Sequence, residues 1–162
     1  MTFDSPLAAY QYAIAQQGFV PDDAQCRAVQ ALQTCFEALH HGRSPIPGVY
    51  LWGPVGRGKT WLMDQFYHSL RVPARRQHFH HFMGWVHQRS FQLSGIHDPL
   101  QALARELSQD VRVLCFDELF VSDIGDAIIL GRLFQVMFEE GVVMVCTCLL
   151  YTSDAADERS SV

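Results

Sequence analysis

The sequence has no CxxC pair, no run of 18 apolar residues, and no basic flank before an apolar stretch at its amino end. Five cysteines without a paired spacing favour a reducing, cytosolic compartment over a disulfide framework. The other two absences argue against a membrane-spanning helix and a secretory signal. Charged residues make up only 18% of the chain, and the net charge is −5 at pH 7. That balance argues against general binding to nucleic acid, although it leaves room for a local basic patch.

Apolar residues make up 49% of the 162 residues, which is enough to bury the core of one domain. Helical patterns of apolar residues alternate with short apolar runs. This alternation predicts an α/β fold in which a mostly parallel sheet lies between two layers of helices. The predicted helices cover 5–16, 22–41, 59–70, 83–93 and 122–140, with a further one that begins at Asp98-Pro99; the predicted strands cover 49–52, 75–82, 111–116 and 142–147.

Residues 53–60 match the phosphate-binding pattern G-x-x-x-x-G-K-[ST] at every fixed position. A predicted strand precedes the pattern and a predicted helix follows it, as a phosphate loop requires. Glycines let the backbone N–H groups turn toward a phosphate, and the helix directs the positive end of its dipole at the same group. We expect Lys59 to reach the β and γ phosphates and the Thr60 hydroxyl to bind Mg²⁺. The predicted ATP-binding residues are Gly53, Pro54, Val55, Gly56, Arg57, Gly58, Lys59, Thr60 and Trp61.

A second predicted strand ends in two acids, Asp117 and Glu118. Ligands bind at the carboxyl edge of parallel sheets, so these carboxylates are expected to face the phosphate loop. Asp117 is the candidate ligand of Mg²⁺, and Glu118 is the candidate general base that polarises the attacking water. We therefore expect Glu118 and Lys59 to be the catalytic residues of an Mg²⁺-dependent ATPase. A small-molecule P-loop kinase is a weaker alternative, because it activates an acceptor hydroxyl and often lacks that glutamate.

Three segments carry a more specific resemblance than the phosphate loop alone. They are GVYLWGPVGRGKTWLMDQFYHSL (48–70), HFHHFMGWVHQR (78–89) and FDELFVSDIGDAIIL (116–130). Together they resemble the ZapE-type division ATPases of bacteria and their mitochondrial AFG-type relatives, over roughly residues 5–147.

The resemblance implies an AAA+ P-loop NTPase fold that binds ATP and Mg²⁺. It also implies a cytoplasmic ATPase that is peripheral to the inner membrane at the division site, acts on or with the tubulin-like protein FtsZ, and forms a homo-oligomer. Within this family the segment 21–25 lies near the adenine, which makes Asp23 and Gln25 candidates for contacting it. The chain divides accordingly into an N-terminal helical segment (1–45), a P-loop ATPase core (46–147) and a tail (148–162).

Two departures from the family pattern concern the carboxyl end of the chain. Relatives continue the fourth strand with Thr-Ser-Asn-Arg-Pro, whereas this chain reads Thr-Cys-Leu-Leu from Thr147, so Leu149 stands where relatives have the polar sensor asparagine. The following segment resembles nothing in the family, and its polar composition predicts disorder. We therefore expect a chain truncated after the fourth strand, without the C-terminal lid domain, that hydrolyses ATP poorly.

The main functional alternative is an ATP-dependent adaptor of the helicase-loader type, which would bind single-stranded DNA when loaded with ATP. A filter-binding assay with single-stranded DNA distinguishes the two hypotheses.

Several smaller clusters also allow both a functional and an ordinary structural interpretation. They are Cys146 and Cys148 (metal site or packing), His78, His80 and His81 (metal site or a partly exposed strand), Arg71, Arg75 and Arg76 with Arg89 nearby (partner contact or a solvated strand start), Asp123 and Asp126 (site mouth or helix cap), and Arg132 (in-trans role or an ion pair with Glu139 or another acid).

Overall fold

The structure is a computed structural model that describes residues 3–42, 46, 48–53 and 58–149. Six helices and four strands follow one another along these residues in the order that the sequence predicts. They are α1 (Pro6–Gln16), α2 (Asp23–His41), β1 (Val49–Gly53), α3 (Lys59–Ser69), β2 (Ala74–His78), α4 (Phe79–Gln92), α5 (Pro99–Asp110), β3 (Val113–Asp117), α6 (Ile124–Glu139) and β4 (Val143–Leu149).

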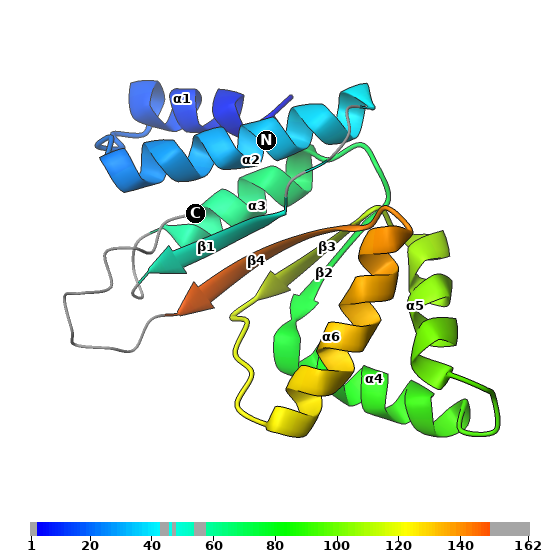
Figure 1. Cartoon of the computed structure of the whole chain (residues 1–162). Coiled ribbons are helices and arrows are strands. Elements are labelled where there is room, and N and C mark those ends of the chain that lie inside the picture. Colours follow the sequence, from blue (N-terminus) through cyan, green and yellow to red (C-terminus); the bar gives the residue numbers. More distant parts are fainter. Residues whose placement is uncertain (1–2, 43–45, 47, 54–57, 150–162) are drawn as a thin grey trace.

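The four strands form one parallel sheet in the order β1-β4-β3-β2. Helices α1, α2 and α3 cover one face of the sheet, and α4, α5 and α6 cover the other (Figure 1). This arrangement confirms the predicted three-layer α/β fold. Since all strands run the same way, their carboxyl ends meet at one edge, where α3 begins and where the loop from β3 to α6 leaves the sheet.

Strand β3 supplies side chains to both layers of the core. Val113 and Cys115 pack in the layer beneath α2 and α3, whereas Leu114 and Phe116 pack in the layer beneath α4 and α6. Phe116 is fully buried, and its ring lies 4.7 Å from that of Phe82, centroid to centroid. A strand buried on both faces reads as a continuous apolar run, which is why its sequence lacks strict alternation.

Aspartate residues cap three of the helices. Asp22 caps α2, accepting from the Ala24 and Gln25 N–H groups. Asp98 caps α5 ahead of Pro99 at the first helical position, as predicted. The same holds for the start of α6, where Asp123 accepts from two backbone N–H groups.

The strand predicted over 75–82 is wrong in its second half, because β2 ends at His78 and α4 begins at Phe79. Phe79, Phe82, Met83 and Val86 recur at helical spacing and are all buried, so the helix buries one continuous face. His80 therefore lies on a helix and shares no strand face with His78. Within the described residues, no group of three or more His, Cys, Asp or Glu side chains is placed to hold a metal ion.

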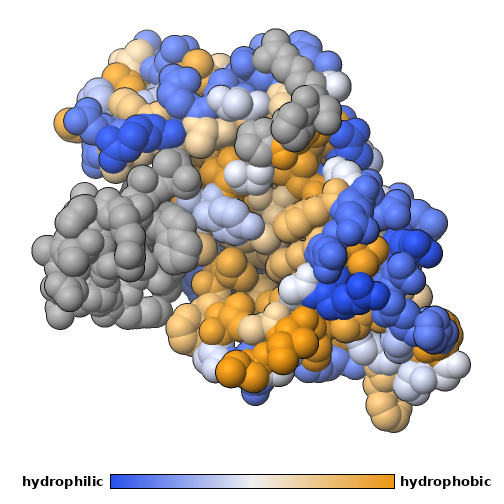
Figure 2. All heavy atoms as spheres, viewed as in Figure 1, coloured by the Kyte–Doolittle hydropathy of each residue, from blue (hydrophilic) through white to orange (hydrophobic). Residues whose placement is uncertain are grey.

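An apolar area is exposed over the loop after β3 and the start of α6, in the lower part of the view in Figure 2. Phe120, Ile124 and Ile128 are 65%, 81% and 70% exposed there. In the part of the chain that the structure describes, no helix has the length and apolar character needed to cross a membrane.

Candidate functional site

The carboxyl edge of the sheet brings together the ends of β1, β3 and β4 and the start of α3. Strand β1 ends at Gly53, α3 begins at Lys59, and β3 ends at Asp117. Helix α3 contacts β1, β3 and β4, so it lies across the middle of the sheet. Of the predicted phosphate loop, Pro54, Val55, Gly56 and Arg57 lie outside the described residues.

The start of α3 differs from the starts of α2 and α6. Gly58, its N-cap, has a left-handed backbone (φ 78°) and provides no side-chain cap, and the first turn of the helix holds no acid. Asp22 and Asp123 cap the other two helices, and each has an acid in its first turn. A helix start without a carboxylate keeps its positive end suited to an external anion.

Gly58 also has a neighbour that restricts its replacement. A Cβ atom at this position would lie 3.3 Å from Gln25 Nε2, on a backbone conformation that L side chains rarely adopt. The side-chain amide of Gln25 is therefore next to the end of the predicted phosphate loop. Trp61 in the first turn of α3 packs against Phe19, with ring centroids 4.8 Å apart. The segment between α1 and α2 thus lies against the start of α3, where the family resemblance expects the adenine.

Lys59 and Thr60 begin α3 at this edge. The Lys59 ammonium is near the Cys148 thiol of β4: burial raises the pKa of Cys148 to about 11, and the charge of Lys59 partly opposes that rise. Thr60 is exposed to solvent. Both side chains are therefore at the edge where the sequence places the phosphates.

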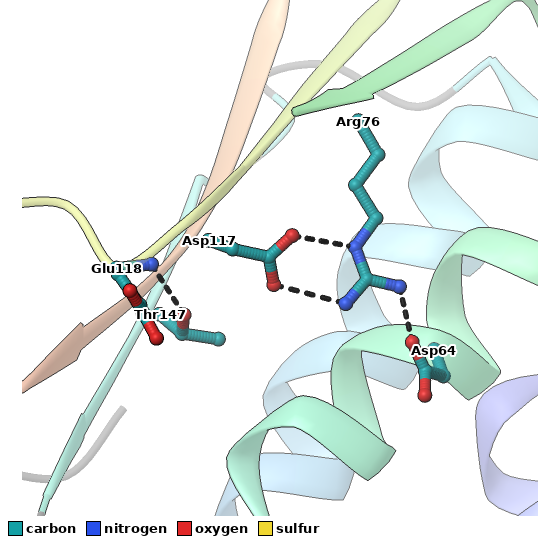
Figure 3. Close-up of polar contacts among 5 residues, drawn as sticks. All are labelled: Asp64, Arg76, Asp117, Glu118 and Thr147. Atoms are coloured by element: carbon teal, nitrogen blue, oxygen red, sulfur yellow. Dashed lines mark hydrogen bonds and ion pairs between the residues drawn. The ribbon is translucent and has the colours of Figure 1, made fainter. Parts of the chain in front are cut away.

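Asp117 is engaged by an arginine that the sequence did not connect with it (Figure 3). Arg76 of β2 donates from Nε to Asp117 Oδ2 at 2.8 Å and from a terminal nitrogen to Oδ1 at 2.9 Å. Its other terminal nitrogen pairs with Asp64 of α3. The hydrogen bond to Asp117 is the main cause that raises the pKa of Arg76, and burial opposes it.

Glu118 is exposed and has a left-handed backbone, with φ 58°. Its N–H donates to Thr147 Oγ1 at 3.0 Å, and the Leu119 N–H donates to the carbonyl oxygen of Thr147 at 2.8 Å. Thr147 is 4% exposed, so a buried residue of β4 fixes the turn that carries Glu118. In Figure 3, Glu118 lies on the opposite side of Asp117 from Arg76.

Leu149 pairs with Gly53 at the carboxyl end of β4, directly beside the residue where the phosphate loop begins. The strand includes Cys148 and Leu149, so the first two residues of the segment predicted as a disordered tail are paired in the sheet. Residues 150–162 lie outside the described residues.

The predicted basic cluster of Arg71, Arg75 and Arg76 is divided among different neighbours. Arg75 and Arg76 are adjacent on β2 and therefore face opposite sides of the sheet, and Arg71 precedes the strand. Arg71 lies over the Phe36 ring at 5.4 Å, and Arg75 lies over Trp85 at 6.0 Å. With Arg76 bound to Asp117, the three do not form one patch.

Other candidate residues outside the site also have structural partners. Arg132 pairs with Asp98 rather than Glu139, and the Asp126 carboxylate accepts from His87 Nε2 at 2.8 Å when that nitrogen carries the proton. Arg89 pairs with Glu106.

A pocket of about 650 Å³ lies at the amino ends of the strands, among Tyr50, Arg112 and Phe138. It is at the opposite end of the sheet from Lys59 and Asp117, and it is not part of the candidate site.

Sequence reasoning missed three residues of the site, namely Arg76 as a partner of Asp117, Asp64, and Thr147. The available signal for Thr147 is a polar residue near the end of a buried apolar strand, a position that parallel α/β folds use for ligand sites. The ion pairs of Arg76 depend on the register between β2 and β3, which the sequence does not contain.

Comparison with known proteins agrees with this geometry. The sequence pattern of the family described as AFG1-like ATPase matches residues 4–155. The chain is 39% identical over 169 residues to the cell division protein ZapE of Escherichia coli (strain K12), and the alignment covers 88% of this chain and 45% of that protein. The chain therefore spans less than half the length of this curated relative.

Solved structures show the same fold at low identity. AMPPCP-bound DnaA from Aquifex aeolicus is similar with a TM-score of 0.60 and 14% identity, over 82% of this chain and 40% of that one. The DnaC helicase loader is similar with a TM-score of 0.58 and 12% identity, over 87% of this chain and 78% of that one. The fold is thus that of P-loop AAA+ proteins, and with a family pattern that extends over nearly all of its length, the chain belongs to the AFG1-like ATPase family.

Proposed function

We propose that this chain binds Mg-ATP at the carboxyl edge of its sheet and hydrolyses the β–γ phosphoanhydride bond. The observation that supports this most strongly is that the uncapped start of α3 and the acids at the end of β3 meet at one edge of a parallel sheet. An electropositive helix start favours the phosphates, and the acids opposite supply a metal ligand and a base.

Each residue of the site has a defined role in this proposal. The backbone N–H groups of residues 53–60 bind the phosphates, and the Lys59 ammonium neutralises charge on the β and γ groups. Trp61 lies in the first turn of α3, next to the proposed nucleotide site. Glu118 is the general base for the attacking water, held in place by the hydrogen bonds of its turn to Thr147. The side-chain amide of Gln25 lies next to Gly58, and we propose that Gln25 and Asp23 contact the adenine ring of ATP.

The oxygen donors present suit Mg²⁺. The Thr60 hydroxyl and the Asp117 carboxylate are hard ligands of the type that Mg²⁺ takes in nucleotide sites. A bound Mg²⁺ supplies charge neutralisation on the transferring phosphoryl group. Thr60 is exposed at the helix start and can accept a cation that arrives with ATP. Both oxygens of Asp117 accept from Arg76, so a cation would have to displace that guanidinium to bind there.

Turnover is expected to be slow. By the family resemblance, Leu149 replaces the asparagine that orients the attacking water, and leucine has no group that can form a hydrogen bond. Replacing it by asparagine is therefore expected to raise the rate of hydrolysis.

The similarity to the cell division protein ZapE supports a place in bacterial cell division. From the family resemblance we propose in addition that FtsZ is the protein partner and that the chain is cytoplasmic and peripheral to the inner membrane. We further propose that 46–147 forms the ATPase core, that 1–45 forms a helical segment beside it, and that the chain works as a homo-oligomer. Cosedimentation of the chain with FtsZ filaments, with and without ATP, tests the partner; no difference from a filament-free control would contradict it.

The nucleotide proposal is tested with a fluorescent ATP analogue and a phosphate-release assay. Lys59→Ala is expected to abolish binding, because it removes the charge that neutralises the phosphates. Glu118→Gln is expected to retain binding and lose turnover, because it keeps the shape of the side chain and removes the base. Unchanged binding by Lys59→Ala would overturn the phosphate site, and unchanged turnover by Glu118→Gln would overturn the role of Glu118 alone.

A further inference from the structure

Arg76 occupies the carboxylate that the proposed function assigns to the metal. Its guanidinium binds both oxygens of Asp117, at 2.8 and 2.9 Å, and it pairs with Asp64 through its remaining terminal nitrogen. The side chains of Arg76 and Asp117 are only 17% and 13% exposed, so water screens this pair weakly. Asp64, at 38% exposed, lies nearer the solvent.

The parallel register explains why this contact forms. Arg76 is opposite Cys115, and His78 is opposite Asp117, so Arg76 and Asp117 lie one diagonal step apart on the same face of the sheet. That face is covered by α3, which contributes Asp64. The planar fork of a guanidinium matches the two oxygens of a carboxylate, and a lysine at this position would offer only a point charge.

The two acids give Arg76 two alternative partners. Without metal, the guanidinium is paired with both. If a cation takes Asp117, the guanidinium keeps its ion pair with Asp64 and does not become an unpaired charge near the core. Asp64 therefore lowers the free-energy cost of releasing Asp117. In a lone buried arginine–aspartate pair, the same release would leave the arginine as an unpaired buried charge.

We propose that Arg76 is a built-in cation that competes with Mg²⁺ for Asp117 and so sets the Mg²⁺ concentration at which the chain takes up nucleotide. The inference rests on the proposed function and concerns the regulation of the same site. Because a guanidinium and a dication repel each other near one carboxylate, loading with metal requires Arg76 to shift toward Asp64.

The test measures binding of a fluorescent ATP analogue by the full chain at increasing Mg²⁺, with a parallel titration in excess chelator. In Arg76→Gln the half-saturating Mg²⁺ concentration is expected to fall by roughly three- to tenfold, because one competing charge is gone. In the same variant, the ratio of the nucleotide affinity in Mg²⁺ to the nucleotide affinity in chelator is expected to rise. This readout measures binding and does not depend on ATP turnover.

Asp64→Asn provides a change of opposite sign at a more exposed position. It removes the alternative partner of Arg76 and one negative charge, so the half-saturating Mg²⁺ concentration is expected to rise. Arg89→Gln is the matched control, since it breaks an arginine–carboxylate pair with Glu106 outside the candidate site. That control is expected to leave the Mg²⁺ dependence unchanged, and thermal melts of all three variants verify folding.

The possible failures are distinguishable. If the unaltered chain binds no nucleotide at any Mg²⁺ concentration, the proposed function is overturned and this inference falls with it. If the unaltered chain binds but Arg76→Gln needs the same or more Mg²⁺, only the competition is overturned. An unchanged or lowered Mg²⁺ requirement in Asp64→Asn overturns the role of Asp64 and with it the release of Asp117, even if Arg76→Gln does not fold.

Discussion

Replacing Thr147 by valine tests whether a buried hydroxyl holds the turn of the candidate base. Valine keeps the shape of the threonine side chain and removes the acceptor of the Glu118 N–H. The backbone contact from the Leu119 N–H to the Thr147 carbonyl remains, so the turn loses one of its two anchors. The turn is also strained, since Glu118 has φ 58° and a non-glycine residue in that region costs about 1–2 kcal/mol.

The expected cost follows from these contacts. A lost hydrogen bond costs about 0.5–1.5 kcal/mol net, and a donor left unsatisfied costs about 1–3 kcal/mol. The hydrogen bond from the Glu118 N–H is only partly buried, so we expect a cost near 1 kcal/mol. For a chain of this size, that corresponds to a decrease in Tm of roughly 2–4 °C.

Urea denaturation and thermal melts followed by circular dichroism measure this cost, and Thr147→Ser provides the comparison. Serine keeps the hydroxyl but loses a buried methyl group, which also costs about 1 kcal/mol. The two variants are thus expected to be similarly destabilised, but ATP turnover is expected to fall in Thr147→Val and not in Thr147→Ser. A Thr147→Val chain as stable as the unaltered chain, within about 0.3 kcal/mol, would refute the role of the hydroxyl.

Three other predictions concern the thiols and the core. A thiol reagent at pH 8 is expected to label Cys26 alone in the folded chain, because it is the exposed cysteine among the described residues; rapid labelling of a second thiol would contradict the fold. Burial raises the pKa of Cys35 and Cys115 to about 12 from an ordinary 9.0, so the unfolded chain ionises first. The free energy of unfolding is therefore expected to fall as pH rises from about 9 to about 12, and replacing both cysteines by alanine is expected to flatten that slope. Phe82→Ala is expected to destabilise the fold by about 3–5 kcal/mol, measured by urea denaturation, because this fully buried ring packs against Phe116; a loss under about 1 kcal/mol would place it outside the core.

The parts of the fold that the sequence predicts correctly depend on short-range chemistry. Asp98 followed by Pro99 defines a helix start through the aspartate cap and the fixed φ of proline, and α5 begins there. The alternation of apolar strands with amphipathic helices was sufficient for the layers and for a parallel sheet. Each of these patterns involves residues within a few positions of one another, so each can be recognised within a single short segment of the sequence.

The residues around His78 show where local patterns are insufficient. Only His78, Phe79 and His80 alternate as a strand would, whereas Phe79, Phe82 and Met83 pack as one helical face. The choice depends on the core to which the segment must present its apolar residues. A five-residue strand already reaches the edge of this sheet, so the chain turns into α4 at Phe79.

Arg76 illustrates the same limit at the site itself. Its neighbours in sequence suggested a solvated basic segment, whereas its partner Asp117 is 41 residues away and joined to it only by the pairing of β2 with β3. A shift of that pairing by one residue would turn the guanidinium to the other face of the sheet, toward α4. The register between two strands therefore decides whether Asp117 faces solvent as a ready metal ligand or is held by a competing charge, and a phosphate-loop pattern alone cannot distinguish the two states.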